Sequence, residues 1–585
     1  MYASVIPALR LPRQLTGPFD YAVPEALSGA VRRGSIVLVP WRGRKIAGLV
    51  VAMSGTPGID KKDIKPIAGV ASAERAPDDL IETFSWMAEH YVASPATVVK
   101  CFVPDVPKRA IMKEPRAADG VRPAKKGEFY GAVVRYATPD EKTAETHALA
   151  AATLGAGKGV IIAVPHHDDV APTVAGLRAA CGDDAVLEFH GDMTMTALWK
   201  SWTAAASGRP LAVVGTRMAV GAPVARLGAI IVHECDSGDL KQYDQNPRYD
   251  ARAVALHRAK QAGAQAVLMS HGPRAEEYAL AVREGFSWKE GGNPSIDAVL
   301  AEPGRGAKSA EERLLTVTAL EAAEKALHSG KKVLLFHNRR GTATAMICRD
   351  CGRIERCATC AIPLRVHADK LHCHRCNRIG AAPLTCKGCG GPSFRTWGMG
   401  TGAVTPILAA AFPDAKVVQA DADTRLKDVA DADIAVGTQF LLHAVAETAS
   451  ASRYGAVIVT SADDLLGHPG FRATENAWRT VRTLADVAAA AEGTLVLQTL
   501  DGESPAIRRL LTAPKAFLAE ELEARDRAGF PPKSALVTVT TVGRTEDEAK
   551  GKIAALAKRL RADLGTRSGA AVTGPHRPGN PFRHG

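Results

Sequence analysis

The sequence has no long apolar segment. None of its 585 residues falls in a run of 18 or more uncharged apolar residues, whereas a helix that spans a bilayer needs about 20. The chain also opens without the pattern of a secretory signal. We therefore expect a protein that crosses no membrane and works in the cytoplasm.

Cysteine is scarce outside one window. Only Cys101, Cys181 and Cys235 lie outside residues 348–389, and the other eight cysteines form four Cys-x-x-Cys pairs within those 42 residues. Each pair can give two thiolates to one tetrahedral ion, and a reducing compartment disfavours the alternative of a disulfide framework. The spacing predicts two zinc ions, each held by four thiolates. The pairs are Cys348/Cys351, Cys357/Cys360, Cys373/Cys376 and Cys386/Cys389.

The spacing between the pairs favours a nested arrangement. The 12 residues between the middle pairs are enough for a short β-hairpin that returns the chain to the same ion. Cys357, Cys360, Cys373 and Cys376 would then share one zinc ion. Cys348, Cys351, Cys386 and Cys389 would share the other. A cross-braced arrangement, with the first pair beside the third and the second beside the fourth, remains the alternative.

The rest of the chain predicts an α/β protein of several domains. Apolar strand-like runs alternate with helical stretches over residues 129–305 and again over 306–504, which is typical of parallel sheets. The cysteine window, within residues 348–397, interrupts the second lobe after its first strand. Two such lobes suggest a nucleotide-driven motor. Residues 505–585 should form an incomplete C-terminal α+β domain, with a strand at Ala535–Val542 and then a helix that begins at a Thr545-x-x-Glu548 capping box.

Residues 1–105 predict a β-rich unit, joined to the first lobe by a basic linker over 106–128. Strands at Ser35–Val39 and Ile46–Val51 flank Pro40–Lys45, which carries one aromatic residue and three cations. Such a turn suits binding to a nucleic-acid backbone, although a plain solvated hairpin fits as well. The formal net charge of +12 permits a polyanionic partner.

A glycine-rich phosphate loop is missing from the first lobe. The best-placed candidate, Tyr136–Thr143, reads YATPDEKT and keeps only Lys142 and Thr143 at the expected offset. A phosphate cradle needs successive backbone N–H groups turned inward, which depends on glycine's freedom in φ. Pro139 removes one donor, and Asp140 and Glu141 place negative charge where phosphates would lie. We therefore do not expect this loop to hold a triphosphate.

Several short motifs occur along the chain besides the phosphate-loop segment. They are the four-pair cysteine array, Asn338-Arg-Arg-Gly341, Phe19-Asp-Tyr21, Val214-Gly-Thr-Arg217, Val436-Gly-Thr-Gln439 and Phe530-Pro-Pro532. Together they resemble the PriA family of bacterial replication-restart proteins, which are superfamily 2 DNA helicases, from about residue 5 to 575. The resemblance implies two RecA-like lobes, the nested zinc arrangement, and an N-terminal unit that holds the 3′ end of a nascent strand through Phe19, Asp20 and the turn near Gly43.

The chain departs from the family's helicases at their catalytic motifs. Residues 233–236 read HECD where the family has an acidic DEEH box, and residues 486–493 read DVAAAAEG where it has catalytic arginines. Losing one such arginine typically costs about 10³–10⁵ in rate. We therefore assign no catalytic residue and expect a branch without helicase activity. Whether ATP still binds without hydrolysis stays open.

The resemblance implies a function in DNA replication restart and primosome assembly. The chain would bind stalled or abandoned forks and single-stranded DNA, and help to reload the replisome. Its partners would be primosome and replisome-loading proteins and single-stranded DNA-binding protein. Two alternatives remain: an active ATP-dependent 3′–5′ DNA helicase, and a zinc-ribbon factor that binds RNA or a polymerase.

Overall fold

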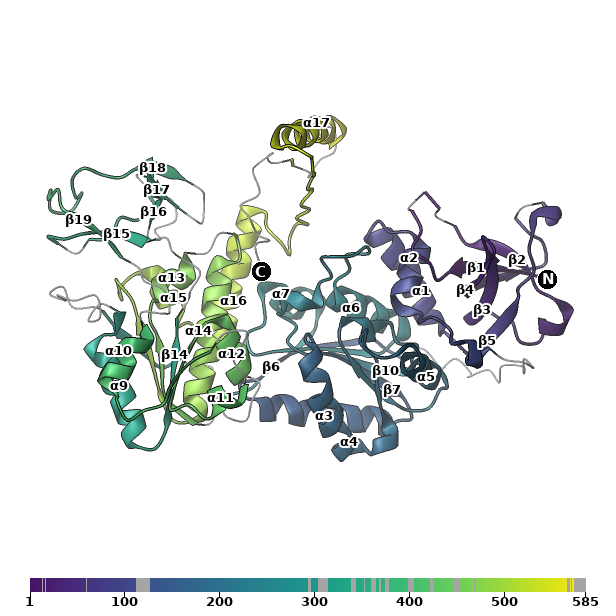
Figure 1. Cartoon of the computed structure of the whole chain (residues 1–585), viewed down its shortest axis with the longest axis horizontal. Coiled ribbons are helices and arrows are strands. Elements are labelled where there is room, and N and C mark those ends of the chain that lie inside the picture. Colours follow the sequence, from purple (N-terminus) through teal and green to yellow (C-terminus); the bar gives the residue numbers. More distant parts are fainter. Residues whose placement is uncertain are drawn as a thin grey trace. The chain divides into compact units, whose positions relative to one another are not determined.

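The computed structural model describes most of the chain and divides it into two compact units, Met1–Glu523 and Ala524–Gly585. Figure 1 shows the elements along the chain. The described residues are all except 13, 16, 59, 112–126, 293–295, 303–313, 338–343, 352, 359–363, 368–369, 374–377, 398–403, 421–425, 447–452, 468–469, 565–568, 570 and 573–585.

The N-terminal region is a five-stranded antiparallel sheet in the order β2-β1-β4-β3-β5. Ala22, in the edge strand β2, is linked to the segment that precedes β5, the strand at the other edge. Ala22 N donates to Lys65 O (3.0 Å), and Ile67 N donates to Ala22 O (2.9 Å). Two helices follow the sheet. The elements are β1 (Tyr2–Pro7), β2 (Phe19–Ala22), β3 (Ser35–Trp41), β4 (Arg44–Ser54), β5 (Gly69–Arg75), α1 (Asp78–His90) and α2 (Pro95–Phe102).

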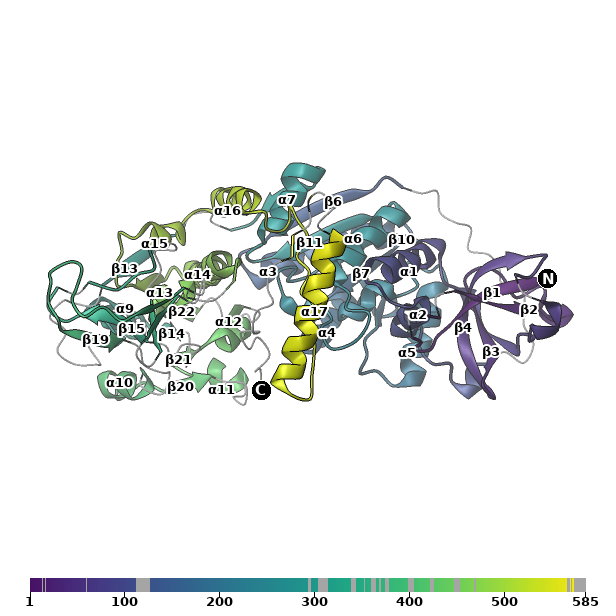
Figure 2. The ribbon, with the colours of Figure 1, turned by 90° about the horizontal axis from the view of Figure 1, so that it is seen from above.

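Helix α1 joins this region to the first lobe. It lies beside α6 in both ribbon views (Figures 1 and 2). Trp86 stacks on His257 with ring centroids 4.2 Å apart, and the buried Arg258 pairs with Asp79 at 3.0 Å. The N-terminal sheet and the first lobe are therefore packed together and share one core.

Lobe 1 is a seven-stranded parallel sheet in the order β12-β6-β11-β10-β7-β9-β8. Its central strands are apolar because helices cover both faces, with α3 and α4 on one and α5 and α6 on the other. The elements are β6 (Tyr130–Arg135), α3 (Pro139–Gly155), β7 (Gly159–Ala163), α4 (Val170–Cys181), β8 (Val186–Glu188), α5 (Met195–Ala206), β9 (Ala212–Gly215), β10 (Leu227–Val232), α6 (Ala251–Ala262), β11 (Gln265–Ser270), α7 (Ala275–Glu284) and β12 (Ser287–Glu290).

Lobe 2 repeats this architecture with a six-stranded parallel sheet, β13-β23-β22-β14-β21-β20. Helices α9 and α10 cover one face, and α12 to α14 cover the other. The expected pair of RecA-like parallel lobes is thereby confirmed. The elements are β13 (Ala298–Ala301), α9 (Val317–His328), β14 (Lys332–Phe336), α10 (Val404–Ala411), β20 (Val417–Ala420), α11 (Leu426–Ala430), β21 (Ile434–Gly437), α12 (Gln439–Ala446), β22 (Tyr454–Val459), α13 (Ala462–Leu466), α14 (Ala473–Ala490), β23 (Thr494–Gln498), α15 (Pro505–Arg509) and α16 (Pro514–Ala528).

The domain boundaries at residues 305 and 504 remain proposals. The lobe 2 sheet includes a strand that precedes residue 305, and the lobe 2 core includes residues that follow residue 504. Strand β13 precedes residue 305 but pairs with β23 of lobe 2. Phe517 and Leu518 follow residue 504 but are fully buried in the lobe 2 core.

The cysteine window forms a separate antiparallel sheet, β18-β17-β16-β15-β19, between β14 and α10. Strands β16 and β17 form a hairpin between the two middle cysteine pairs, as the spacing predicted. The strands are β15 (Thr344–Cys348), β16 (Arg365–His367), β17 (Lys370–His372), β18 (Ile379–Ala381) and β19 (Phe394–Trp397).

In the C-terminal unit, the predicted helix is present and the predicted strand is not. Helix α17 (Glu546–Leu564) begins at the expected cap, where Thr545 Oγ1 accepts from Glu548 N at 3.2 Å. Ala535–Val542 is not a strand, and Val537 and Val542 are 78% and 82% exposed. A strand needs a partner for its backbone hydrogen bonds, and the described part of this unit supplies none.

Across the described residues, no helix combines the length and the apolar character needed to cross a membrane.

Candidate metal centre, DNA-end site and nucleotide cleft

The structure brings the outer two cysteine pairs together. The Sγ atoms of Cys348 and Cys389 are 3.6 Å apart, those of Cys351 and Cys386 are 3.5 Å apart, and all four lie within 4.8 Å of one another. A tetrahedron of sulfur ligands about 2.3 Å from a zinc ion has edges of about 3.8 Å. The four thiols therefore fit one metal ion, in the nested arrangement rather than the cross-braced one.

Local backbone supports this cluster. Gly388 N lies 3.3 Å from Cys386 Sγ, and Gly390 N donates to Cys386 O at 2.8 Å. The amide groups of Cys389 and Gly388 lower the pKa of the Cys386 thiol to about 7.

The second predicted set of ligands is only partly described. Cys357 and Cys373 are both buried, with 2% and 1% exposure, and lie on either side of the β16–β17 hairpin. Cys360 and Cys376 fall outside the described residues.

Asp20 is held in a fixed orientation in the N-terminal sheet. Its Oδ1 accepts from Ser4 Oγ at 2.8 Å on the neighbouring strand β1, and its Oδ2 accepts from Gly58 N at 2.7 Å. A Cβ at Gly58 would lie 3.1 Å from the same carboxylate oxygen, so glycine allows the backbone to approach closely. Each carboxylate oxygen has a second lone pair, which leaves Asp20 able to accept from a ligand hydroxyl.

The β3–β4 hairpin reaches Phe19 although two strands separate β3 from β2 in the sheet. Trp41 contacts Phe19 edge to face, with ring centroids 5.0 Å apart. The turn consists of Arg42 and Gly43, whose φ angles of 44° and 78° are typical of a type I′ hairpin. The predicted loop at 40–45 is thus a two-residue turn, and its three cations, Arg42, Arg44 and Lys45, are exposed.

The segment that replaces a phosphate loop is short and already hydrogen-bonded. Only three residues separate the end of β6 from α3, which begins at Pro139. The Thr138 side chain accepts from Glu141 N at 3.3 Å, and the Thr138 carbonyl accepts from Lys142 N at 3.2 Å. Ala137 N donates to the Glu141 carboxylate at 2.8 Å. Three amides that could face a phosphate, those of Ala137, Glu141 and Lys142, therefore bond within the segment itself.

Lys142 is paired with an acid. Its ammonium lies 3.3 Å from Glu234 Oε1, and that oxygen also accepts from the hydroxyl of the buried Tyr136. Glu234 has a φ of 42° and thus a left-handed backbone conformation. His233, which stands where the metal-binding acid was expected, is buried, with Nε2 2.9 Å from Thr146 Oγ1. Thr143 is exposed on α3.

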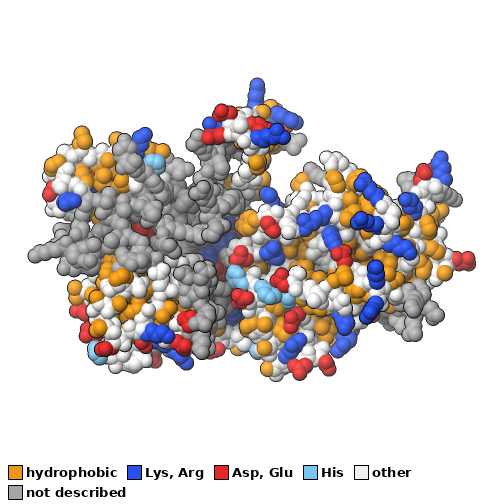
Figure 3. Space-filling model, in the orientation of Figure 1, with side chains coloured by type: hydrophobic (Ala, Val, Ile, Leu, Met, Phe, Trp, Pro, Cys, Tyr) orange, Lys and Arg blue, Asp and Glu red, His pale blue; other side chains and the backbone are white. Residues whose placement is uncertain are grey.

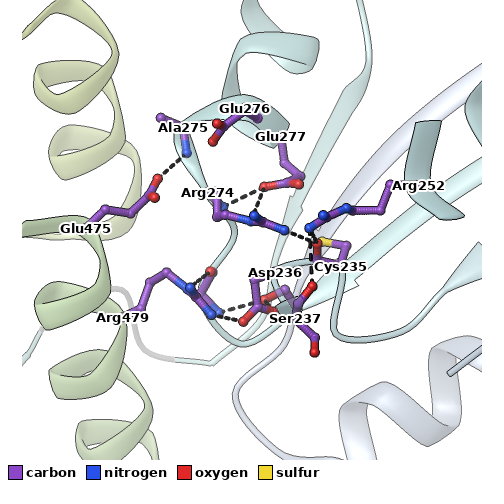
Figure 4. A network of polar contacts seen from close by, with 12 residues as sticks. Cys235, Asp236, Ser237, Arg252, Arg274, Ala275, Glu276, Glu277, Glu475 and Arg479 are labelled. Carbon is purple, nitrogen blue, oxygen red and sulfur yellow. Dashed lines mark hydrogen bonds and ion pairs between the residues drawn. The ribbon is translucent and has the colours of Figure 1, made fainter. Parts of the chain in front are cut away.

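Helix α14 of lobe 2 contacts lobe 1 through a network of charged groups (Figure 4). Arg479 pairs with Asp236 and donates through Nε to Gly272 O at 2.8 Å. Fully buried Glu475 accepts from Ala275 N, at the start of α7, at 2.7 Å. The figure shows both side chains pointing from α14 towards α7 and the loop after β10.

The same helix carries the residue at the start of the missing arginine motif. Asp486 Oδ2 pairs with Arg135 Nη2 of lobe 1 at 2.5 Å, and its other oxygen pairs with Arg482. All three side chains are at most 1% exposed. A carboxylate that joins the lobes thus occupies the region where the family's helicases have arginines.

The sequence did not predict the residues that pair with Asp486 and Asp20, because these residues are far from them along the chain. Arg135 and Asp486 are 351 residues apart, and Ser4 and Gly58 approach Asp20 from other elements. One signal was available: a charged residue, Arg135, ends an otherwise apolar buried strand, which requires a buried partner.

Comparison with known proteins finds similarity to one family. Residues 8–104 match the model of the PriA 3′DNA-binding domain. Replication restart proteins PriA of Synechocystis and Bacillus subtilis are each 29% identical, over 69% and 70% of this chain. The PriA of Treponema pallidum is 26% identical over 95% of this chain and 89% of its own length.

The matches to the first two relatives span only 52% and 53% of those proteins. Among solved structures, RecG bound to a three-way DNA junction has a TM-score of 0.38 and 12% identity, covering 74% of this chain and 48% of RecG. A TM-score this low carries no argument about function. Residues 8–104 thus match a PriA 3′DNA-binding domain, and most of the chain is similar to PriA replication restart proteins.

Proposed function

We propose that this protein binds stalled or abandoned replication forks through its N-terminal region and helps to reload the replisome there, without ATP-driven unwinding. It would act in the cytoplasm, at the nucleoid. Its partners would be forked and single-stranded DNA, primosome and replisome-loading proteins, and single-stranded DNA-binding protein. The observation that carries the proposal is the match of residues 8–104 to the PriA 3′DNA-binding domain, together with the pairing of Lys142 with Glu234 where a phosphate loop was expected.

The N-terminal geometry supports recognition of a DNA end. An aromatic pair, Phe19 and Trp41, offers an apolar surface for a terminal base, and base–aromatic stacking is worth about 1–3 kcal/mol. Asp20 offers a fixed carboxylate beside it, which a 3′-hydroxyl can reach as a donor. The exposed cations of the adjacent turn would contact the phosphate backbone.

The cleft geometry supports the loss of the motor. An ATP phosphate approaching Lys142 would compete with Glu234, and it would meet the negative charge of Glu141. His233 makes a buried contact with Thr146 instead of offering a carboxylate to Mg²⁺. Because Asp486 already joins the lobes, their contact needs no nucleotide.

We further propose that the cysteine module holds two zinc ions. Cys348, Cys351, Cys386 and Cys389 would hold the first, and Cys357, Cys360, Cys373 and Cys376 the second. The clustered Sγ atoms support the first set, and the burial of Cys357 and Cys373 supports the second. Zinc would stabilise the module, since its strands are short and its apolar cluster is small.

Fork binding with matched DNA ends tests the proposal. The full chain should bind a fork with a 3′-hydroxyl leading end more tightly than the same fork with a 3′-phosphate. Asp20→Asn should remove that preference, whereas Asp63→Ala, an exposed aspartate in the same region, should keep it. Equal affinity of the unmodified chain for both ends would count against the proposal, and tighter binding to RNA hairpins would favour the zinc-ribbon alternative.

A further inference from the structure

A second cluster of metal-binding side chains lies in lobe 1, away from the cysteine module. His167 begins the turn after β7, and His190 and Asp192 follow β8. Strands β7 and β8 flank β9 in the parallel sheet, so their carboxyl ends meet at one edge. In open parallel sheets this edge is the usual place for ligands. On the face drawn in Figure 3, histidine side chains gather over lobe 1 beside carboxylates.

The ligand atoms of the three residues converge. One atom from each of His167, His190 and Asp192 lies within 4.8 Å of the others, and the two imidazole rings meet edge to face with centroids 4.7 Å apart. His167 Nδ1 is 3.3 Å from Asp192 Oδ2. That spacing is longer than a charge-assisted hydrogen bond, at about 2.7–2.9 Å. It matches the edge, about 3.4 Å, of a tetrahedron whose ligands lie about 2.1 Å from a zinc ion.

His190 provides the second, independent observation. The residue is only 7% exposed, and its Nδ1 is a buried ring nitrogen with no hydrogen-bond partner among the described residues. The other ring nitrogen, Nε2, lies 3.6 Å from Glu188 Oε2, which is an electrostatic contact beyond hydrogen-bond distance. A carboxylate near a ligating imidazole raises the basicity of the ring.

The cluster carries the charge that a cation needs. Asp192 and Glu188 contribute two carboxylates around the two imidazoles, and Arg178 Nη2 is 4.0 Å from Glu188 Oε1. The backbone is fixed where the ligands attach, because Phe189 N donates to Val214 O at 2.8 Å. Imidazole with a single carboxylate favours Zn²⁺ over Mg²⁺ or Ca²⁺.

From this geometry we propose a zinc site formed by His167, His190 and Asp192, separate from the cysteine centre. Three protein ligands leave one position of a tetrahedral ion for water or another oxygen ligand. A bound ion would join the loops after β7 and β8. The proposal does not depend on the function proposed above.

Zinc content of the full chain tests this site. The chain, with its cysteine centre loaded, would be dialysed against buffered Zn²⁺ and its bound zinc measured by elemental analysis. The unmodified protein should hold one ion more than His190→Gln, and the variant's affinity for that ion should fall at least about 10–100-fold, the loss usual for a change in the surrounding shell alone. Zn²⁺ should also raise the melting temperature of the unmodified chain more than that of the variant.

Two further variants separate a lost ligand from lost folding. His167→Gln and Asp192→Asn change side chains that are 53% and 74% exposed, so both should fold and still lose the extra ion. His328→Gln, at the exposed end of α9, should keep it. Equal zinc content and equal thermal response in the unmodified chain, His167→Gln and Asp192→Asn would overturn the proposal.

Discussion

The N-terminal region and the cleft between the lobes use polar side chains in opposite ways. Around Asp20, neighbouring groups fix the carboxylate while three cations remain exposed to solvent. In the cleft, Lys142 pairs with Glu234, Arg479 with Asp236, and Arg135 with Asp486. A surface that binds DNA must keep charge available, whereas charges that pair across the lobes can hold the lobes together.

The two regions should also differ in how strongly single substitutions affect stability. Burying three charged groups such as Arg135, Arg482 and Asp486 is costly unless they are paired, and such a network is often no more stabilising than apolar residues of similar size. Breaking it by removing one partner is a different matter, because the remaining charges are left buried. The cleft should therefore be sensitive to single substitutions that the exposed N-terminal surface tolerates.

The largest effect should come from the cysteine cluster, whose folding we propose to depend on zinc rather than on paired charges. Cys386→Ser should release one zinc ion and unfold the module, since structural zinc in zinc-finger peptides contributes about 10–16 kcal/mol of apparent binding energy. Metal analysis and far-ultraviolet circular dichroism would measure both effects. Cys181→Ser, outside the module, should change neither. An unchanged zinc content in Cys386→Ser would refute the site.

Removing the carboxylate between the lobes should have the next largest effect. Asp486→Ala leaves Arg135 and Arg482 buried without their partner and should lower the free energy of unfolding by about 3–5 kcal/mol. Denaturant titration would measure it, with Asp414→Ala, an exposed aspartate of lobe 2, as the control. If the two variants were equally stable, the pairing of Asp486 with Arg135 and Arg482 would not hold the two lobes together.

The sequence predicted the parts of the molecule that depend on local spacing. The parallel lobes followed from alternating apolar runs, and the nested cysteine cluster and the β16–β17 hairpin followed from intervals along the chain. The strand at Ala535–Val542 was wrong because β-propensity says nothing about whether a partner strand is present. The link between Arg135 and Asp486 was not predictable, because no local pattern connects residues 351 positions apart.

On the N-terminal side, loss of one aromatic residue should weaken DNA binding without affecting the lobes. Trp41→Ala removes a stacking surface beside Phe19 and should cost about 1–3 kcal/mol in binding to a fork with a 3′ end, with the free energy of unfolding of the lobes unchanged. Fluorescence anisotropy would measure the affinity. Tyr130→Ala, an exposed aromatic residue of lobe 1, serves as the control; equal affinities of the two variants would exclude Trp41 from the contact.

A smaller effect should follow from removing one exposed cation of the turn. Arg44→Ala should weaken binding to all DNA ends alike and reduce the slope of log affinity against log salt by about 1, because one phosphate contact is lost. Binding measured at several salt concentrations would show it, and Lys325→Ala on lobe 2 should leave the slope unchanged. A slope equal to that of the unmodified chain would place the turn outside the DNA contact.

The central claim is that the DNA-end surface persists while the motor is lost, and ATP turnover with forked DNA tests it most directly. The unmodified chain should hydrolyse ATP no faster with a fork than without one, and should not unwind the fork it binds. Phosphoryl-transfer enzymes such as kinases turn over at about 1–100 s⁻¹. Fork-stimulated hydrolysis in that range would contradict the account and make the active helicase the better description.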